Sequence, residues 1–241
     1  GKVVQAEVVG FQNETIFLMP FTEATGIGPG SSVEIISNDA TAKVSHKLLG
    51  RVIDASGDPL DGREKPFCNE EVSLRGIPIN PMERTSIESI LDVGVKAINS
   101  FLTIGKGQRI GLIAGSGVGK SSLMGMLTRF TEADVVVIGL IGERGREVQE
   151  FIKESLGKDG LKKSVVIAAP ANISPVLRIR ATYLTHSIAE YFRDQGKSVL
   201  MMVDSLTRVA HAQREIGLAV GEPPTAKGYP PSVFSILPNL I

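Results

Sequence analysis

A short glycine-rich segment ending in lysine and serine has the clearest chemistry in the chain. Residues 114–121 read Ala-Gly-Ser-Gly-Val-Gly-Lys-Ser. The three glycines allow successive backbone N–H groups to turn toward a polyphosphate, the helix expected next presents its positive N-terminal end, and Lys120 can reach the outer phosphates. Ser121 is the natural hydroxyl ligand for Mg²⁺. The segment therefore predicts a nucleotide triphosphate site with the binding residues Gly115, Ser116, Gly117, Val118, Gly119, Lys120, Ser121 and Ser122.

One residue departs from the strict phosphate-loop pattern, which has Gly at its first position where this chain has Ala114. A glycine-rich turn that joins a strand to a helix and binds no ligand is the alternative. The Gly-Lys-Ser sequence so soon after an apolar run favours the phosphate site.

Two acidic residues follow other apolar runs. Glu143 comes after the run 134–141, and Asp204 comes after the run 198–203. Hydrolysis of a phosphoanhydride needs one carboxylate to polarise water and a second to hold Mg²⁺ with its water shell. We assign the first role to Glu143 and the second to Asp204, so the predicted metal ligands are Ser121 and Asp204. A helix cap for Asp204 and a favourable helix-dipole interaction for Glu143 are the alternatives.

The charged residues beside these acids have no role that spacing alone defines. Arg144, Arg146, Glu147 and Arg208 fit a solvated or ion-paired surface. Arg144 could instead orient Glu143, and Arg208 could lie at a subunit contact. The histidines lack metal-ligand spacing, and the methionines are expected to fill core.

Strands and helices alternate in the second part of the chain. Continuous apolar runs, each followed by a helical stretch, predict an α/β fold with a parallel sheet covered on both faces. Ligands of such sheets bind at the carboxyl ends of the strands, where both acids are expected. The predicted strands are 108–114, 134–141, 164–169 and 198–203. The helices after the first three strands are expected to end at about residues 130, 156 and 194, and the helix after the fourth strand is expected to begin at about residue 207.

The front of the chain is organised differently. Short β-branched segments separated by turn-rich stretches predict a small β-barrel or sheet with strands over 3–9, 15–19, 32–36 and 48–53. Residues 59–81 are rich in Pro, Gly and charge, which predicts a surface linker. We therefore divide the chain into residues 1–80, an N-terminal β-barrel with its linker, and residues 81–241, a catalytic domain.

Composition limits the class of protein. The 241 residues, 42% of them hydrophobic, suffice for one large or two modest domains. A formal net charge of zero gives no overall attraction to nucleic acid or anionic lipid. Cys68 is the one cysteine, so no internal disulfide forms, which fits a reducing compartment. No apolar run is long enough to cross a membrane and no signal peptide opens the chain, so we expect a cytoplasmic protein.

Several longer segments resemble a single family, the ATPase of the bacterial flagellar export apparatus and its relatives in virulence type III secretion. That family is similar to the catalytic subunit of rotary F-type ATPases, and the Gly-Ser-Gly-Val-Gly-Lys segment favours its flagellar branch. The segments that carry the resemblance are 49–54, 60–62, 114–121, 139–148 (Gly-Leu-Ile-Gly-Glu-Arg-Gly-Arg-Glu-Val), 204–208 (Asp-Ser-Leu-Thr-Arg), 212–216 and 221–234.

The resemblance implies a RecA-like P-loop core and Mg²⁺-dependent ATP hydrolysis by a homo-hexamer with its sites at subunit interfaces. By resemblance, Lys120 and Ser121 bind phosphate and Mg²⁺, and Asp204 is the second acid. The catalytic residues would be Glu143, Lys120 and Arg144, with Arg144 supporting Glu143. Residues 222–229 resemble a loop that faces the central channel of the ring, and a flexible linker is the alternative.

The resemblance also implies partners and a location. The partners would be a stator-like regulator, a central coiled-coil stalk protein, and secreted substrates with their chaperones, but no nucleic acid. The protein would associate peripherally with the inner-membrane export gate. In the family, the arginine that reaches a neighbour's γ-phosphate and the adenine pocket lie beyond residue 241, so we expect a fragment that binds nucleotide weakly and hydrolyses it poorly.

Three other classes are weighed against this one. A ring-shaped nucleic-acid translocase needs a basic groove, whereas residues 1–80 hold 7 Lys or Arg and 11 Asp or Glu. A non-catalytic subunit of a rotary motor would keep the phosphate loop but would not need Glu143. A purely structural module would leave the phosphate loop unexplained.

Overall fold

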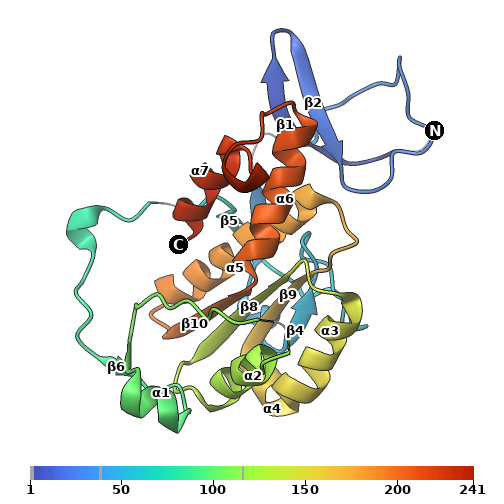
Figure 1. The fold of residues 1–241 in the computed structure, drawn as a ribbon. Coiled ribbons are helices and arrows are strands. Elements are labelled where there is room, and N and C mark those ends of the chain that lie inside the picture. The colour runs from blue at the N-terminus through green and yellow to red at the C-terminus, as the bar shows by residue number, and fades with distance from the viewer. Residues whose placement is uncertain (1–2, 38–39, 77, 116) are drawn as a thin grey trace.

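Four parallel strands form the central sheet of the computed structural model, which describes residues 3–37, 40–76, 78–115 and 117–241. Every residue of the two inner strands is buried. Such apolar, β-branched runs belong in a sheet with both faces covered, as predicted. The strand order is β10 (Val199–Asp204), β8 (Val135–Ile141), β9 (Ser164–Ala169) and β4 (Arg51–Ile53) (Figure 1).

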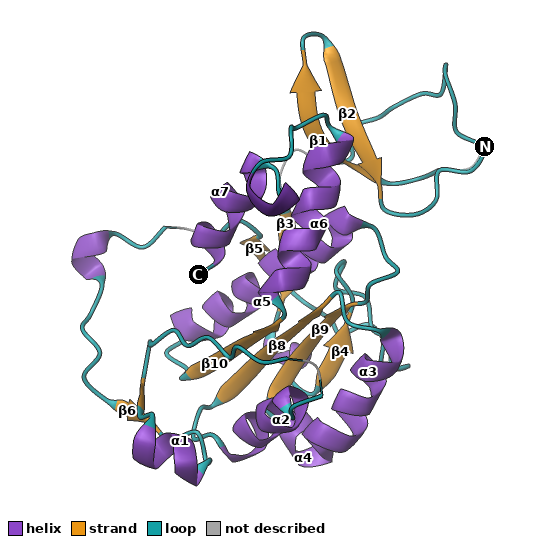
Figure 2. Cartoon of the chain, in the orientation of Figure 1, coloured by secondary structure: helices purple, strands orange, loops and turns teal. Residues whose placement is uncertain are grey.

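Helices cover both faces of the sheet (Figure 2), and alternate residues of β8 belong to the two cores beneath them. Val137 and Ile141 lie in the core beneath α5, whereas Ile138 and Leu140 pack with Met124 of α2. This alternation follows from the two-residue period of a strand. The layers are α5 (Pro175–Asp194) and α6 (Leu206–Ala219) on one face, and α2 (Lys120–Phe130), α3 (Gly145–Glu150), a π-helical turn (Phe151–Leu156) and α4 (Gly157–Lys162) on the other.

The register of the sheet brings two predicted site residues to one edge. Asp204, the last residue of β10, pairs with Leu140 of β8, and Glu143 follows two residues after the end of β8. Both acids therefore leave the sheet at the carboxyl ends of neighbouring parallel strands, which confirms the predicted arrangement.

The chain after α6 folds back against that helix. A loop with a short 3₁₀ turn (Ala226–Gly228) leads into α7 (Pro231–Leu240). A Cβ atom on Gly217 would come within 2.8 Å of the Pro230 side chain, so glycine at this position permits the close approach. The loop after α6 is consequently packed against the helix that precedes it.

Two small antiparallel sheets occupy the front of the chain. β1 (Ala6–Gln12) pairs with β2 (Thr15–Pro20), and β3 (Thr41–Val44) pairs with β5 (Glu70–Ser73). The strand predicted over 32–36 is not formed. Because that segment makes no ladder with the β1–β2 hairpin, the described residues of the front form separate two-stranded sheets, and the predicted barrel is not seen in them.

The linker predicted over residues 59–81 contains regular structure, contrary to the prediction. β5 lies within it, and Leu74, next to β5, is buried in the core under α5. Local composition does not reveal this, because the burial depends on pairing with β3, which is distant in sequence. The segment predicted as a strand over 48–53 begins as a 3₁₀ turn (His46–Leu48) and ends as β4. The division of the chain near residue 80 stays a prediction, although β4 lies in the central sheet.

Between the front and α2, the chain forms a 3₁₀ turn (Pro81–Glu83), the antiparallel pair β6 (Ile90–Leu91) and β7 (Ile104–Gly105), and α1 (Lys96–Phe101). In the described part of the chain, no helix is both long enough and apolar enough to pass through a bilayer.

The prediction of a strand over 108–114 is wrong for this structure. The segment belongs to no sheet, and Ile113 is 100% exposed. Arg109 within it donates a hydrogen bond to the backbone carbonyl of Ile241. An apolar run becomes a strand only when its backbone pairs with another strand. β10 is an edge strand of the sheet, and residues 108–114 form no ladder with it.

Candidate active site

The phosphate loop is an exposed turn that enters α2. Gly115 and residues 117–119 are exposed, and Ser116 lies outside the described residues. Gly117 has φ +77° and Gly119 has φ +93°, the left-handed region that favours glycine, while a Cβ atom on either would meet nothing within 4 Å. Glycine is thus required here by backbone conformation, and the open surroundings leave the loop's backbone free to approach a ligand.

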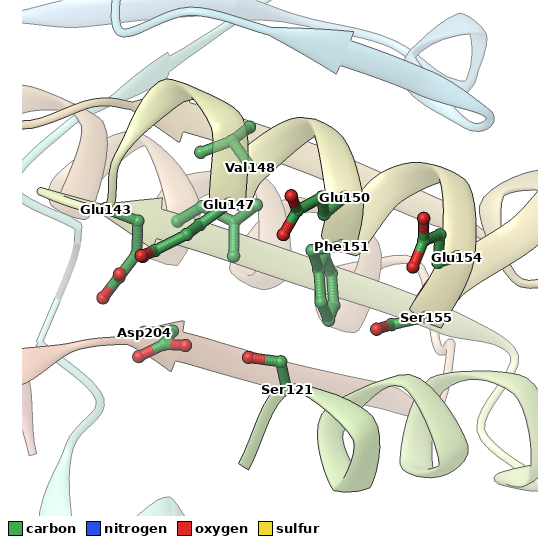
Figure 3. Close-up of a pocket in the computed structure, with 10 residues that line it drawn as sticks. Ser121, Glu143, Glu147, Val148, Glu150, Phe151, Glu154, Ser155 and Asp204 are labelled. Atoms are coloured by element: carbon green, nitrogen blue, oxygen red, sulfur yellow. The ribbon is translucent and has the colours of Figure 1, made fainter. Parts of the chain in front are cut away.

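Lys120, Ser121 and Ser122 form the first turn of α2. The Lys120 ammonium is hydrogen-bonded and ion-paired to Oδ1 of Asp204, across 84 positions of sequence. Ser121 lines the same pocket as Asp204 (Figure 3), whereas Ser122 is exposed and does not line it. The structure therefore brings together three of the predicted residues, Lys120, Ser121 and Asp204.

The pocket itself is strongly acidic. It has a volume of about 190 Å³ and lies between the start of α2 and the helix that begins at α3 (Figure 3). Leu140, Val148 and Phe151 form its apolar wall. Its polar lining consists of Ser121, Ser155 and the carboxyl groups of Glu143, Glu147, Glu150, Glu154 and Asp204.

Glu143 is placed by a glycine at the end of β8. Gly142 has φ +72°, and a Cβ atom there would come within 2.6 Å of the Arg208 side chain. The backbone is held on both sides, because Gly142 N–H donates to Ala169 O at 2.7 Å and Ala171 N–H donates to Glu143 O at 3.0 Å. The close approach of α6 at Arg208 thus requires a glycine before the acid.

The surroundings of Glu143 favour its protonated form. Burial raises the pKa of this carboxyl, and a hydrogen bond with Glu147 and the negative charge of Asp204 raise the pKa further. The positive charges of Lys120 and Arg208 oppose this change. A half-buried carboxyl group with a raised pKa that lines a cleft is a candidate general base.

Glu147 is a residue that the sequence argument left without a role. Its carboxyl group lies beside that of Glu143 (Figure 3) and shares a hydrogen bond with it. Sequence gave no signal for this contact, because Glu143 precedes α3 and Glu147 lies within that helix. Arg144 contacts Glu147, with its Nη1 3.7 Å from Oε1, and its side chain is 76% exposed. Arg144 is thus linked to Glu143 through the Glu147 carboxyl, which contacts both.

Ser121 and Asp204 fit a magnesium ion by the chemistry of their donors. A hydroxyl and a carboxylate are hard oxygen ligands, and Mg²⁺ commonly takes only one or two protein ligands together with substrate phosphates and waters. Within the described residues, no group of three or more His, Cys, Asp or Glu side chains is arranged to hold a metal by itself. The pocket therefore suits a cation that arrives with a polyphosphate.

The fold and the site together define a class. A glycine-rich turn at the start of a helix, a lysine and a serine in its first turn, and two acids at the carboxyl ends of parallel strands are the parts of a P-loop nucleotide-binding protein.

Comparison with known proteins identifies the family. Residues 94–241 match the family model "ATP synthase alpha/beta family, nucleotide-binding domain". The chain belongs to that family.

Among curated relatives, similarity is high along the whole chain. It is 58% identical over 241 residues to the flagellum-specific ATP synthase of Bacillus subtilis (strain 168), covering 100% of this chain and 55% of the relative. It is 56% identical over 247 residues to the flagellum-specific ATP synthase of Salmonella typhimurium, covering 100% and 54%. A type 3 secretion system ATPase of Xanthomonas euvesicatoria is 50% identical over 237 residues, covering 98% and 54%. The chain thus spans about half the length of these relatives.

Solved structures agree with this result. The structure of the assembled ATPase EscN from the enteropathogenic E. coli type III secretion system matches with a TM-score of 0.92 and 44% identity, covering 98% of this chain and 57% of that one. The structure of assembled EscN in complex with its central stalk EscO matches with a TM-score of 0.91 and 44% identity, covering 98% and 58%. The α/β fold with its parallel sheet is therefore shared with EscN.

Proposed function

We propose that this chain is the nucleotide-binding part of an ATP hydrolase that energises protein export through the bacterial flagellar type III secretion apparatus. The observation that carries the proposal is that Ser121, Glu143 and Asp204 line one pocket and that the Lys120 ammonium is ion-paired to Asp204. Identities of 58% and 56% to flagellum-specific ATP synthases support the flagellar reading.

Each site residue has a role in the proposed reaction. Backbone N–H groups of the loop and the Lys120 ammonium bind the phosphates, with Gly115, Ser116, Gly117, Val118, Gly119 and Ser122 completing the loop. Ser121 and Asp204 would hold Mg²⁺, and the ion would supply positive charge to the phosphate oxygens. Glu143 orients a water molecule and accepts its proton, which its raised pKa favours. Arg144 and Glu147 position the Glu143 carboxyl.

The assembly and partners are part of the same proposal. Assembled EscN and its complex with the central stalk EscO support an oligomer with a stalk partner, and we propose that the oligomer is a homo-hexamer. We further propose an N-terminal β-barrel ahead of residue 81, a stator-like regulator, exported substrates with chaperones, and a cytoplasmic location at the inner-membrane export gate. Export of virulence proteins through an injection apparatus is the second candidate, because the type 3 secretion ATPase of Xanthomonas is 50% identical.

The test is the Glu143→Gln variant in a full-length, assembled protein. We expect the rate of Mg²⁺-dependent ATP hydrolysis to fall by about 10³-fold, while affinity for ATP changes by less than about 3-fold. Glu150→Gln is the matched control, because it removes an acid from the same pocket and should keep most of the rate. A Glu143→Gln protein with the parent rate would refute the assigned chemistry. Cells that express the Glu143→Gln protein, assemble it normally and fail to export would tie the hydrolysis to secretion. Failure to export flagellar proteins would support the flagellar apparatus, and failure to export virulence proteins would support the injection apparatus.

A further inference from the structure

The helix that carries Lys120 and Ser121 crosses a second helical segment at very short range. Gly125 of α2 is buried, and a Cβ atom there would lie 2.5 Å from the carbonyl oxygen of Ser155 and 2.8 Å from its carbonyl carbon. Carbon–oxygen contacts are normally about 3.3–3.6 Å long. Any other residue at position 125 must therefore move one of the two elements, which explains why a poor helix former stands inside α2.

The crossing lies one helical turn from the candidate site. Gly125 follows Ser121 by four residues, so both lie on the same face of α2. Ser121 lines the pocket from α2, and Ser155 lines it from the facing π-helical turn (Figure 3). The closest approach at Gly125 thus sets how far apart the two helical walls of the pocket lie.

The facing segment connects this spacing to the acids. α3 continues into the π-helical turn without a break, because Glu150 and Phe151 both have right-handed helical backbone angles. Glu147 lies in this segment and shares a hydrogen bond with Glu143. The segment ends at Gly157, whose φ is +66°, so α4 beyond it is a separate element. A shift of the π-helical turn away from α2 is therefore carried to Glu147 and, through the hydrogen bond, to Glu143.

From this geometry we infer that Gly125 is a positioning residue for hydrolysis. By allowing α2 to touch the π-helical turn, it sets the distance between the phosphate-binding end of α2 and the carboxyl groups of Glu143 and Glu147. The inference deepens the proposed function and rests on it. Lys120 and Ser121 move together with α2, so binding of nucleotide changes little when the gap widens. The water oriented by Glu143 is displaced from the phosphate, and misplacement by about 1 Å costs about 10²-fold in rate.

The crossing has little freedom to adapt. The nearest atoms to a Cβ at position 125 belong to the backbone of Ser155, so no rotamer change clears them. Met124, Phe151 and Leu156 fill the surrounding core, and close-packed side chains transmit a displacement instead of absorbing it. π-helical turns are rare and occur frequently at functional sites.

Gly160 offers a matched control. It is a buried glycine of α4, and its added Cβ would meet side-chain atoms, Leu156 Cδ1 at 3.0 Å and Arg129 Cγ at 3.1 Å. Both side chains are flexible at these atoms and can give way. Because α4 lies beyond the break at Gly157, a change at Gly160 is not carried to the acids.

The experiment compares Gly125→Ala with Gly160→Ala in the full-length, assembled protein. The two readouts are kcat at saturating Mg-ATP and the dissociation constant of Mg-ATP. For Gly125→Ala we expect kcat to fall by at least about 10-fold, while affinity changes by less than about 3-fold. For Gly160→Ala we expect both to stay within about 2-fold of the parent values. General damage to the fold would lower binding as well as rate.

A double-mutant cycle assigns the effect to the crossing. Ser155→Gly removes the Ser155 Cβ, which also lies 2.8 Å from a Cβ at position 125, and loosens the π-helical turn. In this background we expect Gly125→Ala to lower kcat by only about 3-fold. If Gly125→Ala alone does not assemble, comparison of the double variant with Ser155→Gly decides the question.

Several results would overturn the positioning role. These are a parent-like kcat in Gly125→Ala, equal losses of rate and affinity in that variant, or the same kcat in the double variant and in Ser155→Gly. Failure of both Gly125→Ala and the double variant to assemble would also overturn it, because Gly125 would then serve folding alone. A parent protein that does not hydrolyse ATP would refute the proposed function itself, before any variant is compared.

Discussion

Two ion pairs of this molecule share their chemistry but differ in their surroundings. Arg51 of β4 donates two hydrogen bonds to Asp61, from Nε to Oδ2 at 2.6 Å and from Nη2 to Oδ1 at 3.0 Å. Arg63 and the Val52 N–H donate to the same carboxylate, and Arg51 also donates to the Glu64 carbonyl. Both Arg51 and Asp61 side chains are 10% exposed. Every hydrogen-bonding position of the Asp61 carboxylate is used within the protein.

The Lys120–Asp204 pair is built in the opposite way. Its two side chains share one hydrogen bond, Lys120 is 30% exposed, and Asp204, although 8% exposed, lines a pocket. A bidentate, fully satisfied pair fixes the chain around it, whereas a single-contact pair at a pocket can exchange its partners. In these two pairs, the carboxylate with many protein donors, Asp61, stabilises the fold, whereas the carboxylate with one cation contact, Asp204, lines the candidate site.

The largest stability effect should follow from breaking the enclosed pair. Asp61→Asn leaves the Arg51 guanidinium without its counter-charge in a poorly solvated place, so we expect the free energy of unfolding to fall by about 3 kcal/mol. Urea denaturation measures this. ATP affinity of the folded variant should equal that of the parent, since Asp61 does not line the pocket. A fall in the free energy of unfolding of less than about 0.5 kcal/mol would show that this pair does not stabilise the fold.

Acid should weaken the enclosed pair. The hydrogen bonds from Arg51, and next those from Arg63 and the Val52 amide, hold the pKa of Asp61 well below its usual range, against the effect of burial. A lowered pKa in the folded state gives stabilisation that is complete above the unfolded pKa, near 4, and is lost as the pH falls below it. The stability difference between the parent and Asp61→Asn should therefore be constant from about pH 5 to 7 and shrink below about pH 4. A difference that persists unchanged at pH 3 would contradict this explanation.

A smaller effect is expected beside the Lys120–Asp204 pair. In the full-length protein, Glu147→Gln removes a carboxyl whose hydrogen bond raises the pKa of Glu143. We expect the rate of hydrolysis to fall by about 10-fold and the acid limb of the pH–rate profile to move to lower pH, because Glu143 must be ionised to act and would lose its proton more easily. An unmoved acid limb would show that Glu147 does not act through Glu143.

The smallest effect should come from an exposed pair in the same region as Asp61. Lys65 Nζ lies 2.6 Å from Asp58 Oδ1, and the two side chains are 64% and 53% exposed. Asp58→Asn should change the unfolding free energy by no more than about 0.5 kcal/mol, measured by the same urea denaturation. A loss as large as that of Asp61→Asn would mean that enclosure does not decide the strength of these pairs.

The α/β part of the fold could be predicted because its signals are local. The runs that became β8, β9 and β10 are continuous and apolar, and each leads into a helix. The position of Asp204 beside the end of β8 follows from the parallel register once these strands are known. The site residues could be named for the same reason, since they stand at the ends of strongly patterned elements.

The errors fall where structure depends on distant partners. Residues 108–114 have the composition of a strand but pair with nothing here, while β5 has the composition of a linker and pairs with β3. The contact between Lys120 and Asp204 was also beyond sequence reasoning, although both residues were predicted, because side-chain geometry across 84 positions leaves no local signal. The hydrogen bond between Glu147 and Glu143 likewise left no signal, because Glu143 precedes α3 and only Glu147 lies in that helix.

The central claim is that Lys120 belongs to a nucleotide site, and calorimetry of Mg-ATP with this chain and its Lys120→Ala variant tests it most directly. We predict saturable binding by the parent, a loss of affinity of at least about 100-fold in Lys120→Ala, and unfolding free energies within about 1 kcal/mol of each other. Equal binding of Mg-ATP by the two proteins would contradict the assignment of the phosphate site.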